Sequence, residues 1–263
     1  MQLNLAADLT ANTRNTGITN ITDIIKAVQG TKLMIDWHSH ILPGIDDGSQ
    51  DVTESLALLK MLSEQCVDTV IATPHFLANS DTVETFLEKR KKSYDALSQQ
   101  TSEDCPDILL GAEIKYYQGI SRMKDLKSLC IEKSKLLLLE MSISKWTEYT
   151  VREIEELALS RDITVVLAHI ERYLKFQSNE TWERLYGNGV LMQVNASFFT
   201  NFTTKRKALT YLENGRIHFI GSDCHNLTSR APRIGKAFEI INNKLGENFT
   251  NQMNEYGHSV LKK

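Results

Sequence analysis

Short apolar runs alternate with amphipathic stretches along most of the chain. Each run has four to six residues, nearly all of them apolar, which is typical of parallel strands covered on both faces. The predicted strands occupy residues 33–37, 67–72, 108–111, 135–140, 163–168, 190–194 and 216–220.

Between these runs, apolar residues recur with helical spacing. In residues 51–65, for example, Val52, Leu56 and Leu59 share one helix face. Asp51 stands where a helix cap is favoured. Helices are predicted over residues 51–65, 82–97, 147–159, 181–186, 204–212, 232–245 and 247–261. These repeated strand-plus-helix units predict an α/β fold, either a closed parallel barrel or a doubly wound sheet.

Residues 1–32 differ from the remainder of the chain, because they are rich in Thr and Asn and contain few large apolar side chains. Ile21, Ile24, Ile25 and Val28 have the spacing of a helix that could pack on the body. No basic region precedes an apolar stretch, so we do not expect a secretory signal. We predict an N-terminal extension over residues 1–32 and one domain over residues 33–263.

Composition narrows the class of protein. Hydrophobic residues make up 41% of the chain and charged residues 24%, as in ordinary soluble globular proteins. The formal net charge of −3 argues against a nucleic-acid partner, and no apolar run approaches the length of a membrane span. Cys66, Cys105, Cys130 and Cys224 lie far apart without a Cys-x-x-Cys pair, which favours a reduced, cytoplasmic protein.

Residue types that bind metals follow the predicted strands at their carboxyl ends. The first strand leads into His38 and His40, whose imidazoles leave the same face of an extended backbone and can hold one divalent cation. A turn containing Pro and Gly then carries Asp46 and Asp47 back toward that face. Five of the other strands lead into His75, Glu113, Glu140, His169, and Asp223 with His225.

In a parallel barrel all these strand ends open onto one face. Nine side chains would then meet there: His38, His40, Asp47, His75, Glu113, Glu140, His169, Asp223 and His225. Taken singly, each could be a solvated carboxylate, a core histidine or a helix cap, but their coincidence at six of seven strand ends favours metal binding. A set of nitrogen and oxygen ligands without thiolate suits two or three ions of Mn, Fe or Zn. We interpret the remaining histidines, His218 and His258, as structural or surface residues.

Two arginines stand beside these candidate ligands. Arg172 follows His169 by three positions, and Arg230 follows His225 by five. Guanidinium groups next to a metal cluster suit a phosphate ester, because they match phosphate oxygens bidentately. Surface ion pairs are the alternative interpretation.

The motifs at the strand ends resemble those of the PHP superfamily (polymerase and histidinol phosphatase). They are Asp-Trp-His-Ser-His-Ile-Leu-Pro-Gly-Ile-Asp-Asp-Gly-Ser at 36–49, Ala-Thr-Pro-His at 72–75, Gly-Ala-Glu-Ile at 111–114, Ala-His-Ile-Glu-Arg at 168–172 and Ser-Asp-Cys-His-Asn-Leu at 222–227. Within the superfamily, the chain is most similar to the bacterial manganese-dependent protein tyrosine phosphatases of capsule and exopolysaccharide loci. The resemblance covers residues 33–263 and implies a distorted (β/α)7 barrel; the arm over residues 1–32 departs from the shortest family members.

The resemblance also implies roles for individual residues. One ion would be held by His38, His40, Glu113 and Asp223, a second by Glu113, Glu140 and His169, and a third by Asp47, His75 and His225. Arg172 and Arg230 match the family's phosphate-binding arginines. The implied reaction is attack of a metal-bridging hydroxide on phosphotyrosine, and the implied substrate is the phosphotyrosine tail of a bacterial tyrosine kinase that controls polysaccharide synthesis.

Other activities use some of the same residues. Cys224 and Arg230 have the Cys-x5-Arg spacing of thiol-based tyrosine phosphatases. The loop between them has no glycine to wrap a phosphate, and the neighbouring Asp223 would raise the thiol pKa. Histidinol phosphatase, or another small phosphoester hydrolase, would use the same centre. A non-enzymatic binding module would show a damaged ligand set, and every expected ligand is present.

Overall fold

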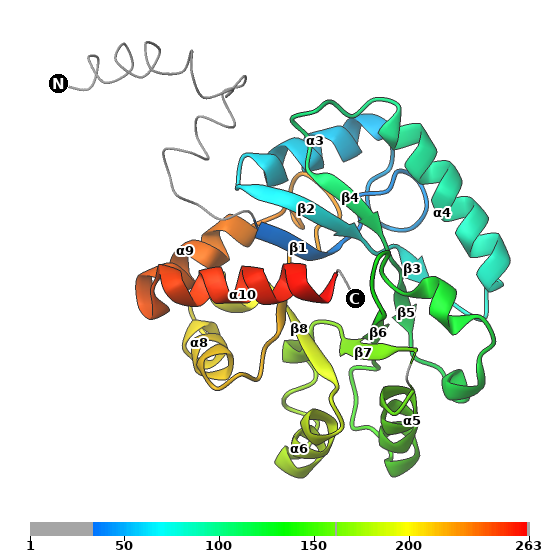
Figure 1. The fold of residues 1–263 in the computed structure, drawn as a ribbon, viewed down its shortest axis with the longest axis vertical. Coiled ribbons are helices and arrows are strands. Elements are labelled where there is room, and N and C mark those ends of the chain that lie inside the picture. Colours follow the sequence, from blue (N-terminus) through cyan, green and yellow to red (C-terminus); the bar gives the residue numbers. More distant parts are fainter. Residues whose placement is uncertain (1–33, 161, 262–263) are drawn as a thin grey trace. The chain divides into compact units, whose positions relative to one another are not determined.

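The computed structural model describes residues 34–160 and 162–261, drawn in colour in Figure 1. The predicted extension over residues 1–32, with its predicted helix, lies outside the described residues. In the part of the chain that is described, no helix is long and apolar enough to cross a membrane. All four cysteines occur as thiols rather than as disulfides, as their spacing in the sequence predicts.

The strands pair only in parallel among the described residues. They are β1 (Met34–Ser39), β2 (Val67–Ala72), β3 (His75–Phe76), β4 (Asp107–Leu110), β5 (Glu113–Lys115), β6 (Leu136–Glu140), β7 (Thr164–Leu167), β8 (Leu191–Asn195) and β9 (Phe219–Gly221). Hydrogen bonding orders them β1-β2-β4 in one sheet and β3-β5-β6-β7-β8-β9 in the other.

The second and third predicted strands, residues 67–72 and 108–111, correspond to β2 and β4, and each is followed by a short further strand that the sequence does not predict, β3 and β5. Residues 73–74 separate β2 from β3, and residues 111–112 separate β4 from β5. Pro74 has no N–H to donate to a ladder, so the regular pairing stops there. Two hydrogen bonds bridge the breaks: the Gly111 N–H donates to the Ala72 carbonyl at 2.8 Å, and the Glu113 N–H donates to the Pro74 carbonyl at 3.0 Å. Beyond them, β3 pairs with β5. The two sheets therefore form one curled surface with seven strand positions.

The curled sheet closes where β9 returns to β1. The Asp223 N–H donates to the His38 carbonyl at 2.8 Å, and the His40 N–H donates to the Cys224 carbonyl at 3.0 Å. A Cβ atom on Gly221 would lie 2.5 Å from the His38 Cβ atom, so only glycine permits this approach. The result is a parallel, TIM-barrel-like fold, which confirms the predicted distorted (β/α)7 barrel.

All seven predicted helices are present, with ends within a few residues of those predicted. The helices are α3 (Val52–Ser63), α4 (Val83–Ser98), α5 (Glu148–Ala158), α6 (Asn179–Gly187), α7 (Ser197–Thr200), α8 (Lys205–Glu213), α9 (Ile234–Leu245) and α10 (Glu247–Val260). Asp51 caps α3 as predicted, by accepting the Glu54 N–H at 2.9 Å. The short α7 has no counterpart among the predicted helices. The chain between β5 and β6 has only two 3-10 turns, η2 (Ile120–Arg122) and η3 (Leu126–Leu129).

Apolar side chains fill the inside of the barrel. Ile35, Trp37, Leu138, Val166 and Phe219 belong to this inner cluster, and the rings of Trp37 and Phe219 stack with their centroids 4.0 Å apart. Helix α10 runs beside β1 (Figure 1), and Gly257 on α10 lets the helix approach the Trp37 ring. Polar side chains are thereby left to gather at the other end of the barrel, beyond the carboxyl ends of the strands.

Candidate metal centre

An extra residue in β1 places its two histidines at the barrel mouth. Asp36 pairs with Val70 and Ser39 pairs with Ala72, so three steps along β1 match two steps along β2. Such a bulge interrupts the alternation of inward and outward side chains. Trp37 can therefore face the apolar interior, while the next residue, His38, joins the polar cluster with His40. The His38 and His40 Nε2 atoms lie 3.1 Å apart.

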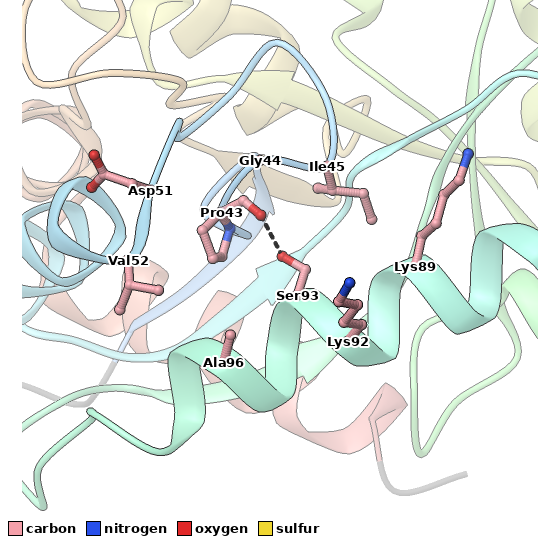
Figure 2. Close-up of a pocket in the computed structure, with 9 residues that line it drawn as sticks. All are labelled: Pro43, Gly44, Ile45, Asp51, Val52, Lys89, Lys92, Ser93 and Ala96. Atoms are coloured by element: carbon pink, nitrogen blue, oxygen red, sulfur yellow. Dashed lines mark hydrogen bonds between the residues drawn. The ribbon is translucent and has the colours of Figure 1, made fainter.

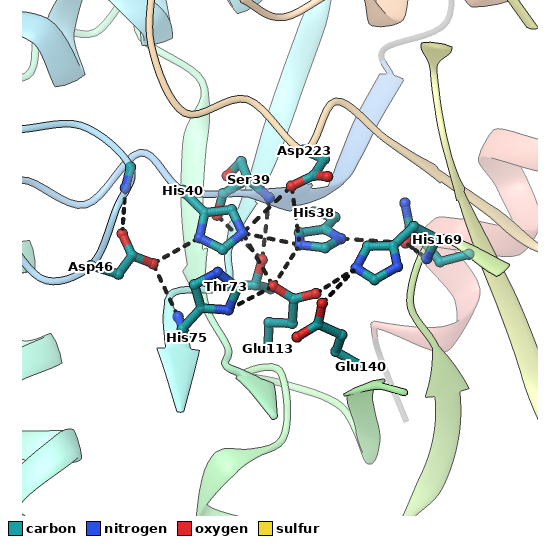
Figure 3. Close-up of polar contacts among 12 residues, drawn as sticks. His38, Ser39, His40, Asp46, Thr73, His75, Glu113, Glu140, His169 and Asp223 are labelled. Carbon is teal, nitrogen blue, oxygen red and sulfur yellow. Dashed lines mark hydrogen bonds and ion pairs between the residues drawn. The ribbon is translucent and has the colours of Figure 1, made fainter. Parts of the chain in front are cut away.

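Glu113 occupies the middle of the cluster, as Figure 3 shows. Its carboxylate lies 3.3 Å from His38 Nε2, 3.3 Å from His40 Nε2, 3.0 Å from His75 Nδ1 and 2.7 Å from His169 Nε2. The side chain is only 1% exposed. Four imidazoles, which lie in or just after β1, β3 and β7, thus surround one buried carboxylate.

The other predicted ligands adjoin this centre. His169 Nε2 lies 3.8 Å from a Glu140 oxygen, and Asp223 Oδ1 lies 3.7 Å from His38 Nε2. Asp47 Oδ1 lies 3.3 Å from His75 Nε2 and 3.5 Å from His225 Nε2. The structure therefore brings all nine predicted ligands into one contiguous group at the barrel mouth.

Within this group, three sets of potential ligand atoms are close enough together to share an ion. They are His40 with Asp47, His75 and His225; His38 with His40 and Glu113; and His75 with Glu113 and Glu140. The third set differs from the one implied by the resemblance, in which Glu113 and Glu140 are joined by His169. His169 is nevertheless in contact with both carboxylates.

Four of the five clustered histidines present one ring nitrogen to the cluster and hold the other outside it, whereas His75 contacts Asp47 and Glu113 with its two nitrogens. His40 Nδ1 lies 2.7 Å from Asp46 Oδ2, and His225 Nδ1 lies 3.0 Å from the Asp223 carbonyl oxygen. Because a carbonyl only accepts, His225 Nδ1 carries the proton and its Nε2 keeps a free lone pair. That Nε2 atom is buried and has no hydrogen-bond partner among the described residues. This arrangement fits a metal-ligating imidazole, whose outer nitrogen is usually held by an oxygen.

The pKa values of the clustered histidines are shifted in opposite directions, so some rings are neutral and others are protonated. Burial lowers the pKa of His169 and lowers that of His225 to about 4, so these two rings are neutral and able to ligate. Burial also acts on His40, but its hydrogen bonds to Asp46 and Glu113 prevail and raise its pKa to about 10. The pKa of Glu113 is held well below its ordinary value, against the effect of burial, by the charge of His38 and the hydrogen bond from His169.

The raised pKa of His40 predicts a pH dependence for the metal-free protein. A group whose folded-state pKa is raised stabilises the fold below its unfolded pKa of 6.5, and this stability is lost as pH rises toward about 10. We expect the melting temperature of chelated protein to fall as pH rises above 6.5. A cation would replace the lost proton, so the fall should be smaller with Mn²⁺; equal slopes in thermal unfolding scans would contradict the prediction.

Two of the clustered residues have strained backbones. His169 has a φ of 33° and Asp223 a φ of 52°, in the left-handed region that non-glycine residues rarely adopt. Hydrogen bonds hold both residues in place: the His169 N–H donates to Gln193 Oε1 at 2.6 Å, and the Asp223 N–H donates to the His38 carbonyl. Such strain is concentrated at functional sites, because there the surroundings determine the conformation.

The sequence does not single out the residues that support this cluster. It places Asp46 in the loop, but the predicted ligand there is Asp47. Gln193 accepts from the backbone of His169 and also contacts His38 Nδ1 at 3.3 Å. Its signal is a single polar residue inside the apolar run over residues 190–194. Tyr173 lies one helical turn after His169, and its hydroxyl is 3.0 Å from His169 Nδ1.

Tyr173 allows the support of His169 to be tested. Its buried hydroxyl also accepts the Met141 N–H at 3.1 Å, so Tyr173→Phe leaves two buried groups without a partner. We expect the free energy of unfolding to fall by about 1–3 kcal/mol. We expect affinity for Mn²⁺ to fall by about 10–100-fold. Denaturant unfolding and metal titration measure the two effects, with the 44% exposed Tyr149→Phe as control; unchanged metal affinity would remove the supporting role.

The loop that carries Asp46 and Asp47 is fastened to the barrel at both sides. Asp46 Oδ2 accepts the His75 N–H at 3.0 Å, in addition to its contact with His40. On the other side, Ser93 Oγ on α4 donates to the Pro43 carbonyl at 2.7 Å (Figure 2). A cavity of about 590 Å³ lies between this loop and α4, and none of the nine predicted ligands lines it.

Both predicted arginines lie at the cluster. Arg172 Nη2 is 2.6 Å from Asp223 Oδ2, and Arg230 Nη2 is 2.9 Å from Asp223 Oδ1. Asn195 also donates to Asp223 Oδ2, at 2.7 Å. Of the two remaining histidines, His218 has the predicted structural role, because its Nδ1 accepts the Met192 N–H at 3.0 Å.

Cys224 is placed unfavourably for nucleophilic attack. It is fully buried within the apolar core, and burial together with the Asp36 charge raises the pKa of its thiol far above the ordinary value. A nucleophilic cysteine needs the opposite, an accessible thiolate with a lowered pKa. These observations weigh against the thiol-based alternative.

Comparison with known proteins places this geometry in a family. A family model described as "Capsular polysaccharide synthesis, CpsB/CapC" matches residues 34–260. The chain is 31% identical over 242 residues to tyrosine-protein phosphatase CpsB of Streptococcus agalactiae serotype III (strain NEM316), covering 87% of this chain and 98% of that protein. It is 33% identical over 228 residues to tyrosine-protein phosphatase CpsB of Streptococcus pneumoniae, covering 81% and 91%.

A solved structure has the same fold. It is described as "Crystal structures of YwqE from Bacillus subtilis and CpsB from Streptococcus pneumoniae, unique metal-dependent tyrosine phosphatases". The TM-score is 0.74 at 24% sequence identity, over 87% of this chain and 94% of that one.

Proposed function

The chain belongs to the CpsB/CapC family of metal-dependent tyrosine phosphatases of capsular polysaccharide synthesis, and from this premise we propose that the cluster in Figure 3 hydrolyses phosphotyrosine in a protein substrate. The observation that carries the proposal is the meeting of nine potential metal ligands and two arginines at one barrel mouth. We propose Mn²⁺ as the metal, because the motifs resemble those of manganese-dependent phosphatases; imidazole and carboxylate ligands without thiolate suit Mn, and they also suit Fe and Zn.

We assign the ligands to three positions. His38, His40, Glu113 and Asp223 would hold one ion, and Glu113 would bridge to a second ion held with Glu140 and His169. Asp47, His75 and His225 would hold the third. Two of the close sets support this division, because one contains His38, His40 and Glu113 and another contains Asp47, His75 and His225. The unpartnered lone pair of His225 Nε2 and the contacts of His169 with Glu113 and Glu140 support it as well. When bound, the cations would supply the Lewis acidity that makes water nucleophilic at neutral pH and neutralises charge on the phosphate.

The chain's own residues would bind and orient the phosphoryl group. Arg172 and Arg230 are held by opposite oxygens of the same Asp223 carboxylate, so their guanidinium groups converge beside the cluster. Fixed guanidinium groups of this kind bind the equatorial oxygens of a phosphoryl group and stabilise their charge during transfer. The leaving tyrosinate has a conjugate-acid pKa of about 10, so it departs without strong acid assistance. We therefore assign no general acid.

The physiological substrate would be the phosphotyrosine tail of a bacterial tyrosine kinase that controls polysaccharide synthesis. The family description supports this proposal by naming capsular polysaccharide synthesis. The four cysteine thiols support a reducing compartment such as the cytoplasm.

Metal removal and substrate comparison test the proposed function together. Chelator-treated protein should lose hydrolysis of a phosphotyrosine peptide, and Mn²⁺ should restore it. The reloaded protein should prefer that peptide to histidinol phosphate, and Cys224→Ser should retain activity. Activity that survives complete metal removal but disappears in Cys224→Ser would overturn the metal mechanism, and a preference for histidinol phosphate would overturn the substrate class.

A further inference from the structure

A pocket with three arginines opens beside the metal-type cluster. Its volume is about 240 Å³, and we refer to it as the arginine pocket. It is lined by Arg172, Asn195, Ala196, Ser197, Ser222, Asp223, Ser229, Arg230, Ala231 and Arg233. Asp223 belongs to both the pocket and the cluster. When the phosphoryl group of a substrate lies at the cluster, the parts of the substrate next to it would therefore lie in this pocket.

Two of the three arginines already have a carboxylate partner. Arg172 and Arg230 both contact Asp223, and Arg230 Nη1 also lies 3.8 Å from Asp47 Oδ2. These contacts hold both guanidinium groups against the inner wall of the pocket. The proposed function uses this pair for the phosphoryl group.

Arg233 differs from this pair in its partners. Its side chain is exposed and, within residues 34–160 and 162–261, has neither an ion pair nor a hydrogen bond. It therefore places an unneutralised positive charge at the outer edge of the arginine pocket.

The backbone around Arg233 is nevertheless held firmly. The Gln65 amide donates to the Pro232 carbonyl at 3.0 Å and accepts the Gly235 N–H at 3.0 Å. One side chain thus fastens the residues on both sides of Arg233. The fixed backbone limits the positions that the Arg233 guanidinium can reach to the neighbourhood of this pocket.

The chain as a whole would not attract an acidic segment, since its formal net charge is −3. A local cation is needed for that purpose. The small volume of the pocket suits a phosphoryl group and one short acidic side chain rather than a larger ligand.

We propose that Arg233 is a specificity-determining residue that binds a carboxylate side chain flanking the phosphotyrosine of the substrate protein. The proposal rests on the proposed phosphatase function. Because Arg233 lies at the edge of the pocket, it acts on substrate binding and leaves the chemical step to the cluster. Ser197, whose hydroxyl has no hydrogen bond among the described residues, lines the same pocket and offers a donor to the same carboxylate.

The test compares three substrates of the Mn²⁺-loaded enzyme. They are p-nitrophenyl phosphate, a phosphotyrosine peptide with Asp or Glu beside the phosphotyrosine, and the same peptide with Ser in those places. Arg233→Ala should raise KM for the acidic peptide about three- to fivefold, the upper part of the range of an exposed ion pair, and leave kcat unchanged. Neither KM nor kcat should change for the other two substrates.

Arg233→Glu should reverse the preference, so that a peptide with Lys beside the phosphotyrosine becomes better than the acidic one. Arg206→Ala removes another exposed positive charge, on α8, and serves as the control. Equal effects on all three substrates would assign Arg233 to the phosphoryl group or to the fold and overturn the proposal, as would no effect on any. Failure of the proposed function would appear separately, as an unmodified enzyme that hydrolyses no phosphotyrosine.

Discussion

Asp223→Asn is expected to lower kcat/KM for a phosphotyrosine peptide about a thousandfold or more, while the protein still unfolds cooperatively. The carboxylate meets both arginines and the imidazoles of His38 and His40, so its charge is needed by the proposed metal site and by the phosphate-binding pair. Removing it weakens cation binding and leaves the arginines with one fewer anchor.

Asparagine is the informative replacement at this position. Asp223 has a φ of 52°, which asparagine tolerates much better than alanine does. The amide oxygen can still accept from Arg172 and Asn195 in place of Oδ2, whereas the amide nitrogen in place of Oδ1 cannot accept from Arg230, so the variant loses the charge and one hydrogen bond. Asp162→Asn, at a side chain 68% exposed, is the matched control. Full turnover by Asp223→Asn would refute its assignment as a ligand and as an anchor for the arginines.

Glu113→Gln is expected to reduce the bound metal by about two ions per chain and to abolish turnover. Glu113 belongs to two of the three close sets of ligand atoms and touches four imidazoles. The replacement has the same size, so packing is preserved while a buried negative charge disappears. The histidines around position 113 would then have no shared carboxylate, so the site would bind cations more weakly.

Elemental analysis of purified protein after Mn²⁺ loading and desalting measures this prediction, with circular dichroism as a check on the fold. Glu103→Gln, at an exposed position, should keep the metal content and activity of the unmodified protein. A Glu113→Gln variant that retains its full complement of metal would show that the carboxylate is not shared between ions.

The candidate ligands at the strand ends could be predicted because two independent signals agree there, the residue type and the parallel arrangement of the strands. His38, His75 and His169 each follow a run of apolar residues, and parallel strands must open their carboxyl ends to one side. Asp51 is recognisable as a cap because aspartate before an amphipathic stretch has few other roles. These are local patterns, and they determine both the barrel and the choice of candidate ligands.

The rest depends on contacts between distant segments. The bulge in β1 is defined only by its pairing with β2, and the break between β4 and β5 only by what lies across it. Gln193 holds His38 and His169 together, yet in sequence it is one polar residue in an apolar strand. The unpartnered charge of Arg233 likewise emerges only when the neighbouring arginines are seen to share Asp223.

The clustered residues are spread along the chain from β1 to β9, so they are synthesised at different times. β1 brings the first two imidazoles, whereas Asp223 and His225 follow β9 and are among the last to leave the ribosome. A chain that ends before β9 therefore lacks one residue from each of two of the three proposed ion positions. In the proposed arrangement, two of the three ion positions are complete only when β9 has joined β1, so the full centre would form after barrel closure.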